Sequence, residues 1–288
     1  MKYYEIDFTL TPCSQDAQDV LSALAGEAGC ETFEETPTGL KAYIQQAFYD
    51  QDSIAAVLEG FPFEHVTIDY TVCEAEDRDW NEQWEQEGFE PICVATAQRS
   101  LIIHDGRHLP ASVEPDTILI EIDAHLAFGT GTHETTRMIC ATLLDMPLEG
   151  KKVLDCGCGT GILGICALKL GAASCVGYDI DEWSTENTRH NSVINRVDDR
   201  LQPFCGDATL LGTLDGRFDL VLANINRNIL LQDMERFVRV MQPAATLILS
   251  GFYQEDCALL ESKAQSLGLS LTATRHDDDW ACMMFTKC

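Results

Sequence analysis

The sequence is poor in positive charge and lacks any long hydrophobic run. Its 288 residues include 47 acidic but only 19 basic side chains, which gives a net charge of −28. A field of that sign repels nucleic-acid phosphates and anionic lipid surfaces, and it favours a basic partner. No apolar run approaches the roughly 20 residues that a membrane-spanning helix needs. We therefore expect neither direct nucleic-acid binding nor membrane binding, and a basic protein as partner.

The cysteines also lack the spacings of a disulfide framework or a metal site. There are 13 of them, an odd number in a long chain, and no Cys-x-x-Cys pair occurs. Cys156 and Cys158 stand too close in sequence to chelate one zinc ion without other ligands. The first residues show no apolar core of a signal peptide. These features predict reduced thiols, no bound metal and a cytoplasmic protein.

The first 75 residues alternate between strand and helix patterns in the order βαββαβ. This order is typical of a ferredoxin-like α+β domain, and we expect residues 1–75 to recognise the substrate. Residues 76–115 are predicted to form a linker and junction segment, which includes Trp80 and Trp84 at helical spacing. The expected strands are 3–10, 30–35, 40–48 and 65–73, and the expected helices are 14–28 and 53–59, the first capped by Ser14.

Residues 116–288 form the second predicted domain, in which strands and helices alternate. Such a series predicts an α/β fold with a mostly parallel, Rossmann-like sheet, helices on both faces and a final hairpin. The expected strands are 117–122, 152–155, 173–179, 201–205, 218–223, 245–250, 269–275 and 280–286. The expected helices are 132–144, 162–170, 182–194, 228–241 and 254–267, and two short strands, 92–97 and 100–103, precede this domain.

A glycine-rich turn between the strand 152–155 and the helix 162–170 resembles a nucleotide cradle. Its glycines at 159, 161 and 164 match the dinucleotide fingerprint, with Asp179 near the offset of a ribose-binding carboxylate. Asp155 argues against a dinucleotide, because a carboxylate facing a pyrophosphate would repel it. The same charge suits the ammonium and sulfonium groups of S-adenosylmethionine (SAM), and Asp-x-Gly-x-Gly-x-Gly is the turn that SAM-dependent enzymes use.

Two further polar residues are expected at the same edge of the sheet, because ligands of α/β sheets bind at the carboxyl ends of the strands. Asn224 follows a buried strand, and its amide is suited to the methyl-transfer region or to an incoming amine, or else it forms an Asx turn into the next helix. Asp207 is suited to accept a hydrogen bond from the adenine amine, or else it caps a helix.

A second unusual stretch, residues 127–136, combines alternate glycines with threonines at a helix start. Together with the cradle, the Gly-x-Asp-Ile-Asp at 177–181 and the Ala-Asn-Ile at 223–225, it resembles the ribosomal protein L11 methyltransferase family (PrmA). The resemblance runs over essentially the whole chain in the right order. It implies a class I SAM-dependent methyltransferase fold behind the small N-terminal domain.

The resemblance also implies a function and a set of site residues. Members of this family methylate lysine side chains and the N-terminal amine of a ribosomal protein, with SAM as cofactor and Asn224 as the matching catalytic amide. The expected cofactor-binding residues are Thr136, Asp155, Gly157, Gly159, Gly161, Asp179, Asp207 and Asn224. The alternatives are a non-catalytic ribosome-associated binding protein and a methyltransferase acting on another substrate. The chain departs from the family pattern at Glu134 and at 226–228, and the second departure bears on the amine site.

Overall fold

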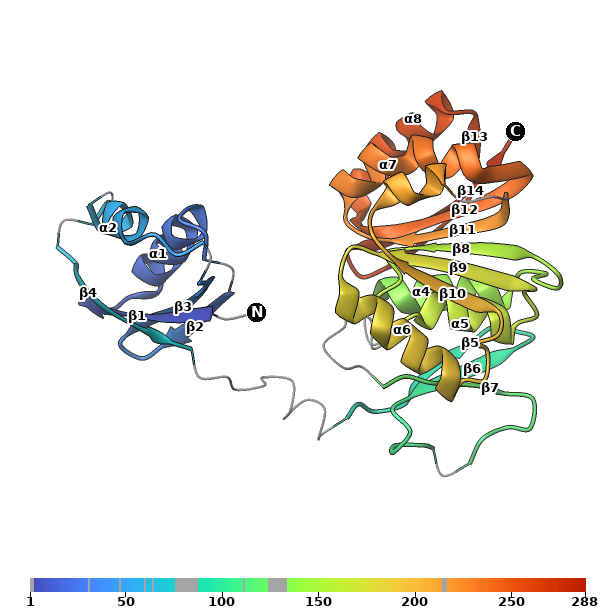
Figure 1. Cartoon of the computed structure of the whole chain (residues 1–288), viewed down its shortest axis with the longest axis horizontal. Coiled ribbons are helices and arrows are strands. Elements are labelled where there is room, and N and C mark those ends of the chain that lie inside the picture. Colours follow the sequence, from blue (N-terminus) through green and yellow to red (C-terminus); the bar gives the residue numbers. More distant parts are fainter. Residues whose placement is uncertain are drawn as a thin grey trace. The chain divides into compact units, whose positions relative to one another are not determined.

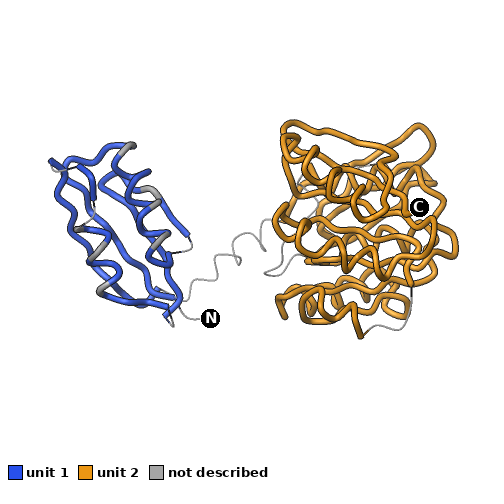
Figure 2. Tube along the Cα trace, turned by 90° about the horizontal axis from the view of Figure 1, so that it is seen from above, with its two compact units in different colours: residues 1–82 blue, residues 83–288 orange. Residues whose placement is uncertain are grey.

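The computed structural model describes residues 3–30, 32–46, 48–59, 61–63, 65–75, 88–110, 112–123, 134–213 and 217–288. The chain divides into two compact units, residues 1–82 and 83–288 (Figure 2). The predicted tryptophan pair, Trp80 and Trp84, and residues 127–133 of the unusual stretch 127–136 lie outside the described residues.

The first unit has the predicted βαββαβ order (Figure 1). Its elements are β1 (Tyr3–Thr11), α1 (Gln15–Glu27), β2 (Thr32–Thr36), β3 (Gly39–Gln45), α2 (Gln51–Glu59) and β4 (Thr67–Glu74). The four strands form an antiparallel sheet in the order β2-β3-β1-β4. This confirms the ferredoxin-like arrangement.

The core of the first unit follows from two simple sequence periods. In β1 the alternate residues Ile6 and Phe8 are buried, because successive side chains of a strand point to opposite faces. In α1 the residues Ala17 and Leu21, four positions apart, are buried on one helix face against them. The predicted cap is confirmed, since the Ser14 hydroxyl accepts a hydrogen bond from the Ala17 backbone.

The second unit is built on a seven-stranded sheet in the order β10-β9-β8-β11-β12-β14-β13. Its strands are β8 (Lys152–Cys156), β9 (Ser174–Asp179), β10 (Leu201–Cys205), β11 (Phe218–Asn224), β12 (Met241–Tyr253), β13 (Leu269–Asp277) and β14 (Trp280–Lys287). The strands β10, β9, β8, β11 and β12 pair in parallel, whereas β14 runs antiparallel to both β12 and β13. The mostly parallel sheet with a closing hairpin is thus confirmed.

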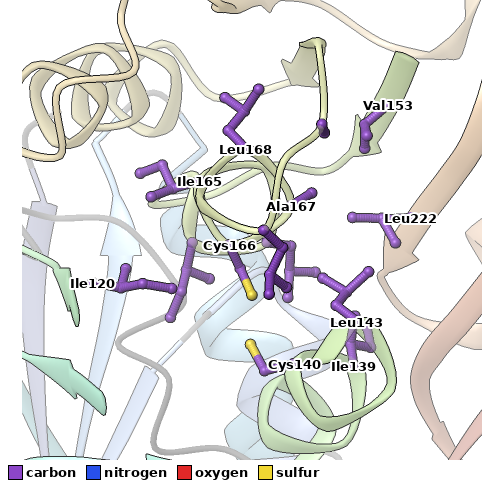
Figure 3. Packing of buried hydrophobic residues seen from close by; sticks show 14 of the residues in the cluster. Ile120, Ile139, Cys140, Leu143, Val153, Ile165, Cys166, Ala167, Leu168 and Leu222 are labelled. Atoms are coloured by element: carbon purple, nitrogen blue, oxygen red, sulfur yellow. The ribbon is translucent and has the colours of Figure 1, made fainter. Parts of the chain in front are cut away.

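Helices cover both faces of this sheet, as predicted (Figure 1). One face carries α4 (Glu134–Leu144), α5 (Ile162–Lys169) and α6 (Glu182–Ile194), and the other carries α7 (Arg227–Val240) and α8 (Cys257–Ser266). In β11, Leu222 packs into the hydrophobic core on the α4–α5 face of the sheet, and Val221 packs into the core on the α7–α8 face. The strand is therefore buried on both faces, which is why its sequence is apolar without a break. Figure 3 shows Leu222 facing α4 and α5, whose Cys140 and Cys166 point toward each other.

A small sheet packs against α4 and α5 on the first face. Its strands are β5 (Ile92–Ala95), β6 (Ser100–His104) and β7 (Ile118–Glu121). Much of the segment 88–115, expected as linker and junction, therefore belongs to the second unit through β5 and β6. Within the described ranges, the helices are all too short or too polar to cross a membrane.

Candidate active site

A cavity of about 620 Å³ lies at the carboxyl ends of the parallel strands in the second unit. Six neighbouring strands, from β10 at one side to β14 at the other, each contribute residues to its wall at or next to their ends on this edge of the sheet. In that order they are Asp207 after β10, Asp179 at the end of β9, Gly157 and Gly159 after β8, Asn224 on β11, Gly251 on β12 and Trp280 on β14. The cavity is where the sequence placed the ligand.

The glycine-rich turn after β8 forms one wall of the cavity because it bends sharply. Gly157 has a φ of 69°, and a Cβ added there would lie 2.4 Å from Cγ2 of Ile225. The backbone N–H groups of Gly157 and Cys158 both donate to the carbonyl of Tyr178 on β9. A glycine is therefore required at 157, both for the left-handed conformation and for space.

Asp179 connects this turn to the end of β9. Its Oδ2 accepts a hydrogen bond from the Gly159 backbone at 2.9 Å, and its Oδ1 accepts one from Asp181 at 3.1 Å. Each carboxylate oxygen has a second lone pair, and the side chain lines the cavity. Asp179 is thus held in place while it still has acceptor capacity for a pair of hydroxyl groups.

Asp155 is placed behind the cavity wall. It is 2 % exposed, and it is not among the residues that line the cavity. Its Oδ2 accepts a hydrogen bond from the Gly164 backbone in the first turn of α5, while its Oδ1 has no partner in the described structure. Burial raises the pKa of Asp155 to about 7, against the opposing effect of the Gly164 hydrogen bond. The expectation that this carboxylate faces a ligand directly is not met by the geometry.

Asn224 and Thr136 come together from distant parts of the chain. The Asn224 side-chain nitrogen donates to the Thr136 hydroxyl at 3.4 Å, and both residues line the cavity. The alternative Asx role belongs to a neighbour, because Asn226 caps α7 by accepting a hydrogen bond from the Ile229 backbone. Asn224 therefore presents its amide at the cavity.

Of the two roles that the sequence left open for Asp207, the structure shows the cap. Its Oδ1 accepts hydrogen bonds from the backbone and the hydroxyl of Thr209, and so it caps the 3₁₀ turn η1 (Ala208–Gly212). These bonds lower the pKa of Asp207. The residue also lines the cavity. Gly161, by contrast, does not line it, but its φ of 81° begins α5.

Three asparagines hold the cavity wall from behind, two on α6 and Asn195 at its C-terminal cap, and no motif in the sequence pointed to them. Asn191 is fully buried, donates to the Thr160 carbonyl at 3.0 Å and accepts from the Asp123 backbone at 2.9 Å. Asn187 donates to the Asp123 carbonyl, and Asn195 exchanges two hydrogen bonds with the backbone of Glu121. The signal was their spacing of four residues, which places all three on one helix face.

The residues at the cavity fit SAM on observations of this structure. A glycine-rich turn too tight for a Cβ approaches the cavity, a fixed carboxylate stands at the next strand end, and an amide–hydroxyl pair stands on the other side. These groups suit ribose hydroxyls and the polar end of an amino acid, respectively. The donors and acceptors of the cavity therefore complement those of a nucleoside that carries an amino-acid chain.

Comparisons with known proteins show which family the chain is similar to. The family model of "Ribosomal protein L11 methyltransferase (PrmA)" matches residues 13–288. A protein of that name from Bacteroides thetaiotaomicron is 44 % identical over 287 residues, which cover 99 % of this chain and 100 % of the relative. Another, from Porphyromonas gingivalis, is 42 % identical over 292 residues, covering 99 % and 98 %.

A solved structure shows the same similarity in three dimensions. The ribosomal protein L11 methylase of Lactobacillus delbrueckii subsp. bulgaricus superposes with a TM-score of 0.62 at 25 % sequence identity. The match covers 69 % of this chain and 99 % of that chain. The sequence matches given above, unlike this structural match, extend over nearly the whole of both units.

Proposed function

Because this chain belongs to the ribosomal protein L11 methyltransferase (PrmA) family, we propose that it methylates amines of ribosomal protein L11 in the cytoplasm. The methyl donor is SAM, and the acceptors are lysine side chains and the N-terminal amine. The predicted N-terminal domain, residues 1–75 within the first unit, recognises the substrate protein. The net charge of −28 supports this, since it attracts a basic protein.

The cavity residues divide into those that hold the nucleoside and those at the transfer end. Asp179 binds the ribose hydroxyls, and Asp207 binds the adenine amine. The protein backbone at Gly157 and Gly159 passes close to the ligand. Thr136 and Asn224 hold the amino-acid end and the acceptor. The remaining expected residues, Asp155 and Gly161, act from behind, by fixing the start of α5.

When bound, the cofactor supplies an electrophilic methyl group, so the protein needs only to orient and desolvate the acceptor. Holding two reactants in line is worth up to about 7–11 kcal/mol of the barrier. The amine, with an unperturbed pKa of about 10.4, first loses its proton to solvent. A nearby cation in a partly dry cavity lowers that pKa. Asn224 and Thr136 would hold the deprotonated amine in line with the methyl group that the cofactor would supply, and no dedicated general base is required.

The meeting of Asn224, Thr136 and Asp179 at one cavity is the observation that carries this proposal. The test incubates the full chain with isotopically labelled SAM and dissociated ribosomal proteins, and maps the label by mass spectrometry. We expect labelled lysine and N-terminal residues in L11. Label in RNA or in other proteins alone would refute the substrate, and a failure to bind SAM would favour a non-catalytic binding protein.

A further inference from the structure

An aromatic pair stands at the far end of the cavity from the expected ribose position. Trp280, at the start of β14, lines the cavity, and Tyr253, at the end of β12, stacks on it with ring centroids 4.4 Å apart. Tyr253 remains 48 % exposed. The two residues are directly paired between β12 and β14, so that one ring lines the cavity and the ring beside it is partly exposed to solvent.

The sheet order places this pair on the acceptor side of the cavity. Asp179 ends β9, and Asn224 lies on β11, two inter-strand steps away (β9-β8-β11); Trp280 lies two steps farther (β11-β12-β14). At about 4.8 Å per step, β9 and β14 are separated by roughly 19 Å. Trp280 therefore lies beyond the transfer end that Asn224 marks, where the acceptor enters.

Acidic residues lie next to both members of the aromatic pair in the sequence. Among the described residues, Glu255, Asp278 and Asp279 are exposed and form no ion pair. Their segments are fixed to each other, because the backbone of Gln254 donates to the Asp279 carbonyl at 2.9 Å and its side chain to the Asp278 carbonyl at 2.6 Å. The nearby arginines are already paired, Arg227 with Asp256 and Arg137 with Asp277. The region therefore has an excess of negative charge.

We propose that Trp280 and Tyr253 form an entry subsite, which binds the acceptor ammonium group before the amine reaches Asn224, with the acidic side chains steering it there. This rests on the proposed function and names the residues that select its substrate. An ammonium group is attracted to an aromatic face, and recognition of methylated ammonium groups is a common use of such surfaces. The subsite accordingly retains partly methylated lysine as well as lysine, and it supports repeated methylation of one side chain.

The first test measures kinetics on L11 with the full chain at saturating SAM. Tyr253→Leu and Trp280→Leu raise KM for L11 roughly 3- to 30-fold, the range expected from loss of a cation–π contact. They also lower the mean number of methyl groups per lysine at low conversion, and Tyr253→Leu, at a residue that does not line the cavity, leaves SAM affinity unchanged. The matched Tyr253→Phe and Trp280→Phe variants keep an aromatic face and retain most of the wild-type behaviour. Because Tyr253 is half-exposed, its variants test the proposal even if Trp280→Leu does not fold.

A charge-matched comparison tests the steering. The double variant Asp278→Asn/Asp279→Asn raises KM for L11, more so at low salt. The control Asp198→Asn/Asp199→Asn removes the same charge from exposed residues before β10, at the opposite end of the strands, and leaves KM unchanged. An equal effect of both double variants would contradict a local steering role.

The second test does not depend on L11 being the substrate. Nα-acetyl-trimethyllysine methylamide is titrated by NMR into the full chain saturated with S-adenosylhomocysteine. We expect saturable binding that Tyr253→Leu abolishes and Tyr253→Phe retains. Absence of binding to the wild type, or equal binding by both variants, would overturn the subsite. Inactivity on L11 together with such binding would refute the proposed substrate alone.

Discussion

Replacing Asn191 with leucine tests whether α6 holds the cavity wall. Leucine is similar in size, but it removes the bonds to the Thr160 carbonyl and from the Asp123 backbone. A buried polar group left without a partner costs about 1–3 kcal/mol, so two such groups cost about 2–6 kcal/mol. That is a large part of the roughly 5–15 kcal/mol that stabilises a domain.

The assay is urea unfolding of the full chain, combined with SAM titration. We expect the free energy of unfolding to fall by the amount above. SAM affinity falls in the folded fraction, because Thr160 directly follows Gly159, which lines the cavity. The control, Asn228→Leu at an exposed position of α7, changes stability by less than about 0.5 kcal/mol. A loss below about 1 kcal/mol for Asn191→Leu would refute the reasoning, since it would mean that both groups find other partners.

Three further predictions concern the cavity. Asn224→Ala lowers the turnover number for L11 more than it weakens SAM binding; unchanged turnover in steady-state kinetics would remove its catalytic role. Gly157→Ala places a Cβ against Ile225 and adds left-handed strain, so calorimetry shows weaker SAM binding in a folded protein, and wild-type affinity would contradict the close packing. The pKa of Asp155 rises to about 7 on folding, so wild-type stability falls as pH rises from about 4 to 7, where only the folded state keeps the proton. Asp155→Asn removes this slope from urea midpoints measured across that range, and identical slopes would show that the carboxyl titrates normally.

Most of the fold was predictable because hydrophobic period and local caps agree with the final structure. The continuous apolar run at β11 indicated a strand buried on both faces, and Ser14 marked the start of α1. The helix expected over 254–267 instead begins as the 3₁₀ turn η2 (Gln254–Asp256), where the chain is tied to the β13–β14 turn. Such a long-range contact leaves no local signal.

The site was predictable residue by residue only where a motif fixed the geometry. The sequence placed Asp179, Thr136 and Asn224 at the cavity. It could not show whether Asn224 or Asn226 caps α7. It also assigned Asp155 to the ligand on charge alone, whereas its hydrogen bond to Gly164 places it behind the turn. Which side of a strand end a side chain occupies depends on the whole sheet.

Calorimetric titration of SAM into the full chain tests the central claim, that this cavity is the cofactor site, most directly. We expect one SAM per chain, with affinity reduced roughly 10- to 100-fold by Asp179→Asn, since hydrogen bonds to a charged group contribute about 1.5–3 kcal/mol. The control Asp198→Asn, at the other end of the strands, leaves affinity unchanged. Absence of binding by the wild type, or equal affinity in the Asp179→Asn variant, would contradict the account.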